Sequence, residues 1–124
     1  MRDYTKILAW KMADDLVVNI YEASKGFPKD ELYALTSQLR RAAYSVPSNI
    51  VEGSSRESKK DYLHFLHISR GSLSETHYFI HLATRLGYIT EINAAPLSSA
   101  AIETHRVLSG LIKAVTRETL DNRP

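Results

Sequence analysis

Histidine is the side chain whose type and spacing first suggest chemistry in this sequence. His77 and His81 stand one helical turn apart, and two imidazoles at that spacing hold a metal ion when further ligands join them. The residue after His77 is Tyr78, whereas a zinc hydrolase of the HExxH type needs glutamate there. His64 and His67 lie too far along the same helix to complete a ligand set. The sequence therefore predicts solvated or half-buried histidines, no metal site and no other cofactor.

A second chemical pattern is the pair Arg70 and His77, which six residues separate along one helix edge. Helical ribonucleases of the HEPN type carry an arginine and a histidine at such a spacing, so RNA cleavage is one function to weigh. Nine arginines and five histidines make such a pair common by chance, and Gly71 is not the usual polar companion. No nucleophile elbow or phosphate-binding glycine loop is visible in the sequence. We predict that the protein is not an enzyme.

The segment from Phe27 to Gly53 is expected to form one helix with two stripes, because a helix advances about 100° per residue. Its apolar stripe consists of Leu35, Leu39, Ala42, Val46 and Ile50. The polar stripe beside it consists of Gln38, Arg41, Ser45, Asn49 and Glu52. A helix needs only the apolar stripe to pack in a bundle. The polar stripe therefore indicates function or specific assembly.

Arg41 needs a partner if it lies beside the core, because breaking a buried ion pair costs about 3–5 kcal/mol. Glu52 on the same helix and Glu75 on the next one are the expected partners. The polar seam is defined as Gln38, Arg41, Ser45, Asn49, Glu52 and Glu75. Its remaining members would satisfy one another or the backbone of a neighbouring helix. Such a seam either fixes helix register or a subunit contact, or forms a surface that binds nucleic acid or protein.

Positive charge gathers around the end of this helix. Between residues 38 and 60 the cations are Arg40, Arg41, Arg56, Lys59 and Lys60, against the acids Glu52 and Glu57. The whole chain has a formal net charge of only +2, although its pI is about 8.9. Two interpretations stay open, a solvated helix end with scattered charges and a patch that contacts phosphates. The five cations are the candidate nucleic-acid-binding residues.

Four helices must position these groups. We expect them at about residues 6–24, 29–53 and 57–86, with the last one starting near Ala95 or, with a kink at Pro96, earlier. Pro47 predicts a kink in the second helix because proline removes one backbone hydrogen bond. Ser58 and Asp61 offer one of two capping starts for the third helix. Short connections between long amphipathic helices predict an all-α, antiparallel up-down-up-down four-helix bundle.

Helical periodicity also predicts which residues face inward. In the first helix they are Trp10, Ala13, Val17, Ile20 and Tyr21, and in the last they are Ala101, His105, Leu108, Leu111, Ile112 and Val115. The third helix carries a further apolar group towards its back, consisting of Ile68, Tyr78, Phe79 and Leu82. These four are the candidate oligomer interface, because such a patch would be buried against another copy. The alternative is a scatter of ordinary surface apolar residues.

The bulk properties are those of one ordinary domain. The chain has 124 residues, of which 44% are hydrophobic and 24% charged, and we expect a single domain over residues 1–124 with a frayed tail at about 121–124. There is no cysteine, which suits a reducing compartment. The sequence begins with no signal peptide and has no run long enough for a membrane span. We expect a cytoplasmic protein with no membrane partner.

The polar stripe lies within residues 33–53, which read YALTSQLRRAAYSVPSNIVEG. This segment resembles the signature of the four-helix proteins of the 23S ribosomal RNA intervening-sequence family. Further matches are Trp10-Lys11-x-Ala13, Phe27-Pro28, Gly71-Ser72-Leu73-x-Glu75 and Leu86-Gly87-Tyr88-Ile89. The resemblance covers about residues 7–112. The sequence departs from the family at Val51, where alanine is more usual, and at Pro96.

The resemblance implies a bacterial, antiparallel four-helix bundle that assembles into a homopentameric ring. Members can be encoded within insertions in ribosomal RNA genes, and related accessory proteins of diversity-generating retroelements form similar pentamers that bind nucleic acid and a reverse transcriptase. It also implies that the polar seam is the family-like set of polar residues. The family's molecular activity is largely unassigned. We therefore predict a non-enzymatic, oligomeric bundle that binds RNA, with a protein-interaction scaffold that recruits a partner protein as the alternative.

Overall fold

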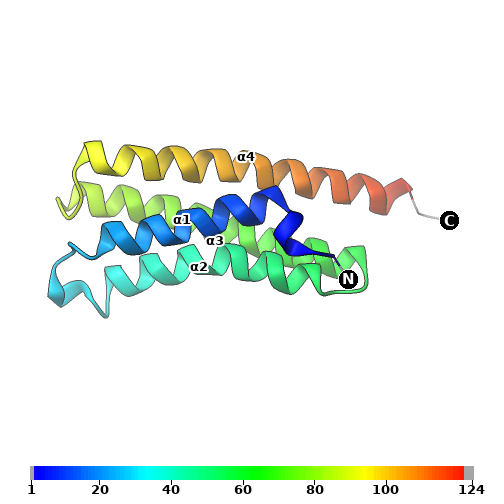
Figure 1. Ribbon diagram of the computed structural model, residues 1–124, viewed down its shortest axis with the longest axis horizontal. Helices are drawn as coiled ribbons and strands as arrows, with labels where there is room; N and C mark the ends of the chain where they lie inside the picture. The colour runs from blue at the N-terminus through cyan, green and yellow to red at the C-terminus, as the bar shows by residue number, and fades with distance from the viewer. Residues whose placement is uncertain (1, 122–124) are drawn as a thin grey trace.

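The protein is a bundle of antiparallel helices. The computed structural model describes residues 2–121, and within them it contains four α-helices, two short 3₁₀ turns and no strand. The elements are η1 (Tyr4–Lys6), α1 (Leu8–Ser24), η2 (Lys29–Glu31), α2 (Leu35–Ser54), α3 (Lys59–Arg85) and α4 (Glu91–Asp121). The connections alternate between the two ends of the bundle (Figure 1). The all-α four-helix fold expected from the sequence is confirmed, while residues 122–124 of the expected frayed tail lie outside the described residues.

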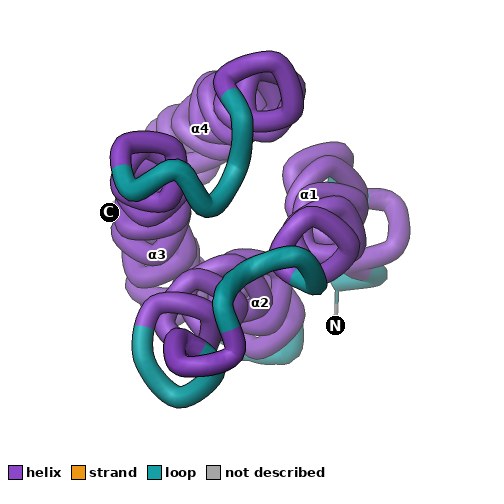
Figure 2. Tube along the Cα trace, turned by 90° about the vertical axis from the view of Figure 1, so that its left-hand side faces the viewer, coloured by secondary structure: helices purple, strands orange, loops and turns teal. Residues whose placement is uncertain are grey.

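The helices surround one apolar core, with α3 placed between α2 and α4 (Figure 2). Its largest fully buried apolar side chains are Leu16, Ile20, Val46, Ile50, Leu66, Leu73, Ile80 and Leu108. Two inward predictions were wrong. Tyr21 is 38% exposed, because the buried face of α1 runs through Leu16 and Ser24 instead. His105 is exposed, because the inward position of α4 is taken by Thr104, whose Oγ1 donates to the carbonyl of Ala100 at 2.7 Å.

The helix boundaries follow local chemistry. Ser58 caps α3, since its Oγ accepts the backbone N–H of Asp61 at 3.1 Å, which confirms the second of the two capping starts. The start of α2 was predicted too early. The acids near residue 30 lie in the separate turn η2, and Ala34 has a non-helical backbone with φ −124° and ψ −108°, so α2 begins at Leu35.

Both internal prolines are accommodated within helices. Pro47 lies inside α2 and is buried, and the helix continues past it to Ser54. Pro96 lies inside α4, which begins at Glu91, the earlier of the two starts left open by the sequence. The side-chain oxygen of Thr90 accepts the backbone N–H of Asn93 at 3.2 Å and so supports this early start. Among residues 2–121, no helix offers a stretch long and apolar enough to cross a bilayer.

Gly53 brings α2 and α3 into close contact. A Cβ atom at this position would lie 2.9 Å from Cβ of Phe65 and 3.2 Å from the carbonyl oxygen of Tyr62. The residue was expected to end the helix, but α2 runs one residue further, to Ser54. Its role is therefore a close approach of two helices at the end where α2 turns into α3. This end and the flanks of α3 carry the polar side chains described below.

Candidate functional site

The inner part of the polar seam is satisfied by hydrogen bonds within α2 and between α2 and α3. Ser45 and Ser72 join their hydroxyl oxygens at 2.9 Å. The amide Nδ2 of Asn49 donates to the carbonyl and to Oγ of Ser45, at 2.7 and 3.0 Å. One turn deeper, Oγ of Ser69 donates to the carbonyl of Val46 at 2.8 Å. The Ser45–Ser72 and Ser69–Val46 bonds join α2 to α3, whereas the Asn49 bonds lie within α2. Ser45 and Asn49 thus satisfy each other, as the sequence predicted.

The outer part of the seam is open to solvent. The α2–α3 hollow has a volume of about 120 Å³ and is lined by Gln38, Arg41, Ala42, Ser45, Ser72 and Glu75. The expected ion pair of Arg41 is not formed: Glu52 pairs with Arg56, and among the described residues neither Glu52 nor Glu75 pairs with Arg41. Arg41 is exposed, so water solvates its charge and no buried partner is required. The hollow instead presents one cation, one acid and one amide outward.

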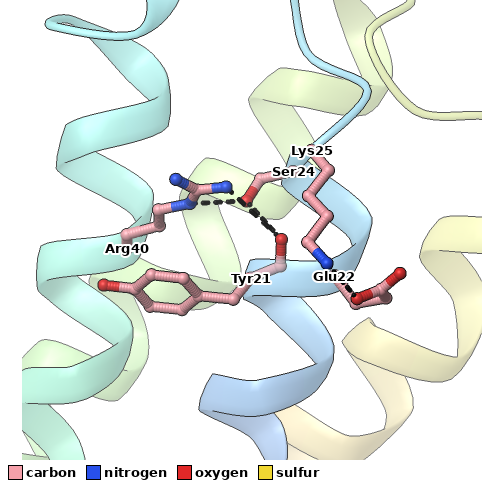
Figure 3. A network of polar contacts seen from close by, with 5 residues as sticks. All are labelled: Tyr21, Glu22, Ser24, Lys25 and Arg40. Atoms are coloured by element: carbon pink, nitrogen blue, oxygen red, sulfur yellow. Dashed lines mark hydrogen bonds and ion pairs between the residues drawn. The ribbon is translucent and has the colours of Figure 1, made fainter.

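Arg40 joins α1 to α2 (Figure 3). Its Nε donates to Oγ of Ser24 at 2.8 Å and its Nη2 to the carbonyl of Tyr21 at 3.4 Å. The guanidinium carbon also lies 4.6 Å from the centre of the Tyr21 ring. Because a helix C-terminus is negatively polarised, a cation there is favourable. Arg40 was predicted to contact nucleic acid, but the structure uses its guanidinium to hold the end of α1.

The five candidate cations do not form one patch. From Arg40, α2 continues for 14 residues to its end at Ser54, which is about 21 Å at 1.5 Å per residue, and Arg56 follows that end. Arg56 pairs with Glu52, and Nζ of Lys59 lies 3.5 Å from Oε2 of Glu118 on α4. Lys60 is exposed, and no ion pair involves it within residues 2–121. The structure therefore divides the predicted patch into a clamp near Ser24 and a charged group at the opposite end of the bundle.

Sequence reasoning missed Arg2, which joins that charged group. Its Nη1 donates to the carbonyl of Arg56 at 2.8 Å, and its backbone N–H donates to the carbonyl of Ser54 at 3.2 Å. Its guanidinium carbon lies 4.0 Å from the centre of the Tyr62 ring. A single residue near the start of the chain gives no periodic signal, so the sequence could not place it. The α2–α3 end is defined as Arg2, Arg56, Lys59 and Lys60 with the acids Glu52 and Glu118.

Tyr62 lies beneath this end and is only 3% exposed. Burial raises the pKa of its hydroxyl above the ordinary value of about 10, because the phenolate would lose its hydration. The positive charge of Arg2 acts to lower this pKa, and the carboxylate of Glu118 acts to raise it. The packing beneath the α2–α3 end thus disfavours ionisation of Tyr62.

A second polar region lies between α3 and α4. The α3–α4 groove has a volume of about 300 Å³ and is lined by Leu73, Ser74, His77, Ala101, Ile102 and His105. Near it, Arg70 Nη1 donates to Oγ of Ser109 at 3.4 Å, and Ser109 Oγ lies 3.5 Å from Nδ1 of His105. His105 was missed because its spacing matched the inward stripe. Among residues 2–121, no three metal-ligating side chains are grouped so as to hold an ion.

The candidate oligomer interface is only partly outside the core. Ile68 and Tyr78 are 40% and 56% exposed. Phe79 and Leu82 are half-buried and pack against the core of the same chain, so placing them on the back of α3 was wrong. The rings of Tyr78 and Phe79 lie 5.8 Å apart. The apolar surface available to a second copy is therefore smaller than the sequence suggested.

The fold and its polar surfaces define an all-helical bundle. The family model for the 23S rRNA-intervening sequence protein matches residues 5–110, and the chain belongs to that family. It is similar to the crystal structure of a protein of unknown function from the S23 ribosomal protein family of Bacteroides thetaiotaomicron. That match has a TM-score of 0.79 at 23% identity and covers 86% of this chain and 99% of the other. Comparison with curated proteins found no match.

Proposed function

We propose that this chain is a non-enzymatic, self-associating bundle that binds RNA through its α2–α3 end. The observation that carries the proposal is the convergence there of Arg2, Arg56, Lys59 and Lys60, which come from the start of the chain, the turn after α2 and the start of α3. The family description, a 23S rRNA-intervening sequence protein, is consistent with an RNA partner. Lysine and arginine contacts to phosphates supply most of the affinity in sequence-independent binding.

The ion pairs at this end do not prevent phosphate contacts. The side chains of Arg56 and Glu52 are 43% and 51% exposed, and those of Lys59 and Glu118 are 37% and 60% exposed. Exposed ion pairs contribute only about 0–1 kcal/mol. A phosphate can therefore replace a carboxylate at Arg56 or Lys59, while Lys60 is available without such an exchange. This mode predicts modest affinity that weakens strongly with salt.

Fluorescence anisotropy tests the proposal. Structured ribosomal RNA, single-stranded RNA and duplex DNA are titrated at two salt concentrations with the wild type and with Lys59→Glu/Lys60→Glu. We expect the variant to bind at least about tenfold more weakly and to lose about 0.7–0.9 units of log–log salt slope for each phosphate contact removed. The matched control is Lys25→Glu/Lys29→Glu, which changes the net charge equally at the other end of the bundle.

Equal losses in both double variants would mean that only overall charge matters and would overturn the assignment to the α2–α3 end. Unchanged affinity in Lys59→Glu/Lys60→Glu would also overturn it. Absence of binding at low salt would reject the RNA function altogether. Cleavage of the RNA by wild type that His77→Ala abolishes would show an enzyme and contradict the non-enzymatic proposal.

A protein-interaction scaffold is the second candidate, and the α2–α3 hollow favours it. Its exposed Gln38, Arg41 and Glu75 offer donors and acceptors that no ion pair within residues 2–121 occupies and that a partner or another copy can bind. Helix α3, which carries Glu75, also exposes Ile68 and Tyr78. We expect a ring of five copies, as the family resemblance implies. The same salt series separates the candidates, because an interface rich in apolar contacts depends less on salt than phosphate contacts do.

Light scattering after size-exclusion chromatography tests self-association. We expect Ile68→Glu/Tyr78→Glu to give smaller species than the wild type while keeping its helical content by circular dichroism. Leu82 is unsuitable for this test, because its contacts with the core would confuse loss of assembly with loss of folding. Val18→Glu, at an apolar position of α1 that is 63% exposed, is the control. An assembly of unchanged size in the α3 variant would remove this face from the interface.

A further inference from the structure

The α3–α4 groove differs chemically from the α2–α3 end. Its floor and wall carry the apolar side chains Leu73, Ala101 and Ile102, and its polar lining consists of Ser74, His77 and His105. None of the six lining residues is acidic. Its volume of about 300 Å³ lies at the lower limit of pockets that hold small molecules. The groove therefore offers a neutral to positive site for a compact ligand with one apolar face.

Arg70 supplies a positive charge beside this groove. Its Nη1 donates to Oγ of Ser109 at 3.4 Å, and its Nη2 lies 3.3 Å from Nδ1 of His67. These partners are a hydroxyl and an imidazole nitrogen, and among the described residues no carboxylate pairs with Arg70. By contrast, Arg106 on α4 is paired with Glu103. The charge of Arg70 is consequently uncompensated by an ion pair and available to an anion.

The lack of a carboxylate partner alone does not make an arginine a ligand site. Arg40 also bonds to a hydroxyl and a carbonyl, but its charge complements the C-terminal end of α1. Arg70 lies in the middle of α3, where no helix end compensates it. It is connected to the groove through Ser109, whose Oγ lies 3.5 Å from Nδ1 of His105 in the groove wall. A ligand in the groove can therefore meet the guanidinium, a hydroxyl and an imidazole together.

From this arrangement we infer that the α3–α4 groove binds a nucleotide monophosphate. The phosphate accepts hydrogen bonds from Arg70, Ser109 and His105, and the flat base lies against Leu73 and Ile102. Charge-assisted bonds of this kind are about twice as strong as neutral ones. The imidazole of His77, one turn after Leu73 on the α3 wall, provides a flat face for the base. The ligand is either a free mononucleotide or the phosphorylated terminal nucleotide of an RNA, and this site is separate from the α2–α3 end.

Nuclear magnetic resonance titration of the full chain with AMP tests this inference. We expect saturable shifts of the His77 and His105 resonances at about millimolar ligand or below. Adenosine and inorganic phosphate should each bind at least about tenfold more weakly than AMP, since adenosine lacks the phosphate and inorganic phosphate lacks the base. Absence of saturable shifts at these histidines, or equal binding of adenosine and AMP, would overturn the inference.

Two variants locate the phosphate contact. Arg70→Gln should weaken AMP binding by at least about tenfold, and His105→Ala provides a second variant in case Arg70→Gln disturbs the fold. The control is Arg106→Gln. Arg106 lies on α4 and its guanidinium is already paired with Glu103, so this variant should keep the AMP affinity within about twofold of the wild type. Unaltered AMP affinity in both groove variants would overturn the assignment.

A short single-stranded RNA with and without a 5′-phosphate distinguishes the two sources of the ligand. Preference for the 5′-phosphorylated RNA identifies an RNA end, and preference for AMP over that RNA identifies a free nucleotide; either result supports the site. The titration is repeated in Lys59→Glu/Lys60→Glu. If this variant still binds AMP, the groove is a separate site whether or not the α2–α3 end binds RNA. Loss of AMP binding in this variant would contradict a separate site.

Discussion

The α2–α3 end and the α3–α4 groove use positive charge in opposite ways. At the end, Arg56 and Lys59 each face a carboxylate, from Glu52 and Glu118. Beside the groove, Arg70 bonds to a serine hydroxyl and an imidazole nitrogen, and no carboxylate pairs with it among the described residues. The two regions therefore differ in whether the fold supplies a compensating carboxylate, which a phosphate must displace at Arg56 and Lys59.

The comparison also separates surfaces that suit different ligands. The end gathers several exposed cations that are widely accessible, which suits a long phosphate backbone bound without sequence preference. The groove is small, acid-free and partly apolar, which suits one nucleotide bound by shape and charge together. The following predictions alter one region at a time, so that each shows whether the two regions are as independent as their positions on α3 suggest.

The largest effect is expected at Gly53, because the α2–α3 end depends on the close approach of two helices there. Gly53→Ala places a Cβ 2.9 Å from Cβ of Phe65 and 3.2 Å from the Tyr62 carbonyl oxygen. We expect it to lower the free energy of unfolding by about 1–3 kcal/mol, since the helices must move apart. Chemical unfolding followed by circular dichroism measures this change.

The matched control for that prediction is Gly71→Ala. Gly71 also lies inside a helix, but a Cβ there would have nothing within 4 Å. Alanine is favoured over glycine in a helix interior by about 0.5–1 kcal/mol, so this variant should be more stable than the wild type. Equal effects of the two substitutions would show that the approach at Gly53 does not constrain this end.

Removing the compensating acids sharpens the comparison directly. Glu52→Gln/Glu118→Gln leaves Arg56 and Lys59 without ion pairs, so the α2–α3 end should then resemble Arg70 in carrying uncompensated charge. We expect RNA affinity at low salt to rise by about tenfold, because no carboxylate then competes with phosphate. AMP affinity at the groove should change by less than about twofold. Anisotropy and NMR titrations measure the two affinities.

The control for the acid removal is Glu22→Gln/Glu103→Gln, which raises the net charge equally at ion pairs outside both regions. An equal gain in RNA affinity in this control would mean that net charge, and not the local loss of carboxylates, governs binding. A gain in AMP affinity only in Glu52→Gln/Glu118→Gln would show that the two regions are coupled.

A smaller effect, on stability alone, is expected at Arg40. Arg40→Gln removes the bonds to Ser24 and Tyr21, and we expect the free energy of unfolding to fall by about 1 kcal/mol. Its neighbour Arg41 is exposed and makes no ion pair among the described residues, so Arg41→Gln should stay within about 0.5 kcal/mol of the wild type. Thermal unfolding measures both. A loss of RNA affinity in Arg40→Gln at unchanged stability would restore it as a ligand contact.

The sequence predicted the fold well because helical periodicity and short connections carry most of the information about a bundle. It also predicted the Ser45–Asn49 part of the polar seam, where both residues lie on one face of one helix. It failed where the outcome depends on tertiary distances. The contacts of Arg70 with Ser109 and of Lys59 with Glu118 join α3 to α4, so they do not follow from spacing along a single helix. The Glu52–Arg56 pair, by contrast, has the i, i+4 spacing that favours an ion pair, so this pair could have been predicted from the sequence.

The errors at Tyr21 and His105 have a related cause. Both residues sit at the margin of an apolar stripe, where a rotation of the helix by a fraction of a residue decides between core and solvent. In α4 that rotation buries Thr104, whose hydroxyl bonds to its own helix, and turns His105 into the groove. A polar group of the groove was thereby hidden in the sequence as a presumed core residue.

The smallest predicted effect concerns pH and tests the burial beneath the α2–α3 end. Burial, the main cause, raises the pKa of Tyr62 in the folded chain above about 10. As pH rises, the unfolded chain loses this proton first, so the folded chain binds more protons and its stability falls. The contribution is complete below about pH 10 and is lost as pH rises through the folded pKa. Tyr62→Phe has no such proton and should not show this part of the decline.

Urea unfolding of the wild type and Tyr62→Phe from about pH 8 to 11 measures the difference between their unfolding free energies. That difference should be constant at the lower pH values and shift against the wild type above about pH 10. Tyr33→Phe is the control, because Tyr33 is 93% exposed, and its curve should parallel the wild type. Parallel curves for Tyr62→Phe as well would mean that Arg2, which acts to lower this pKa, offsets the burial. The α2–α3 end would then stabilise a negative charge beneath it, and its cations would resemble Arg70 more closely than their ion pairs indicate.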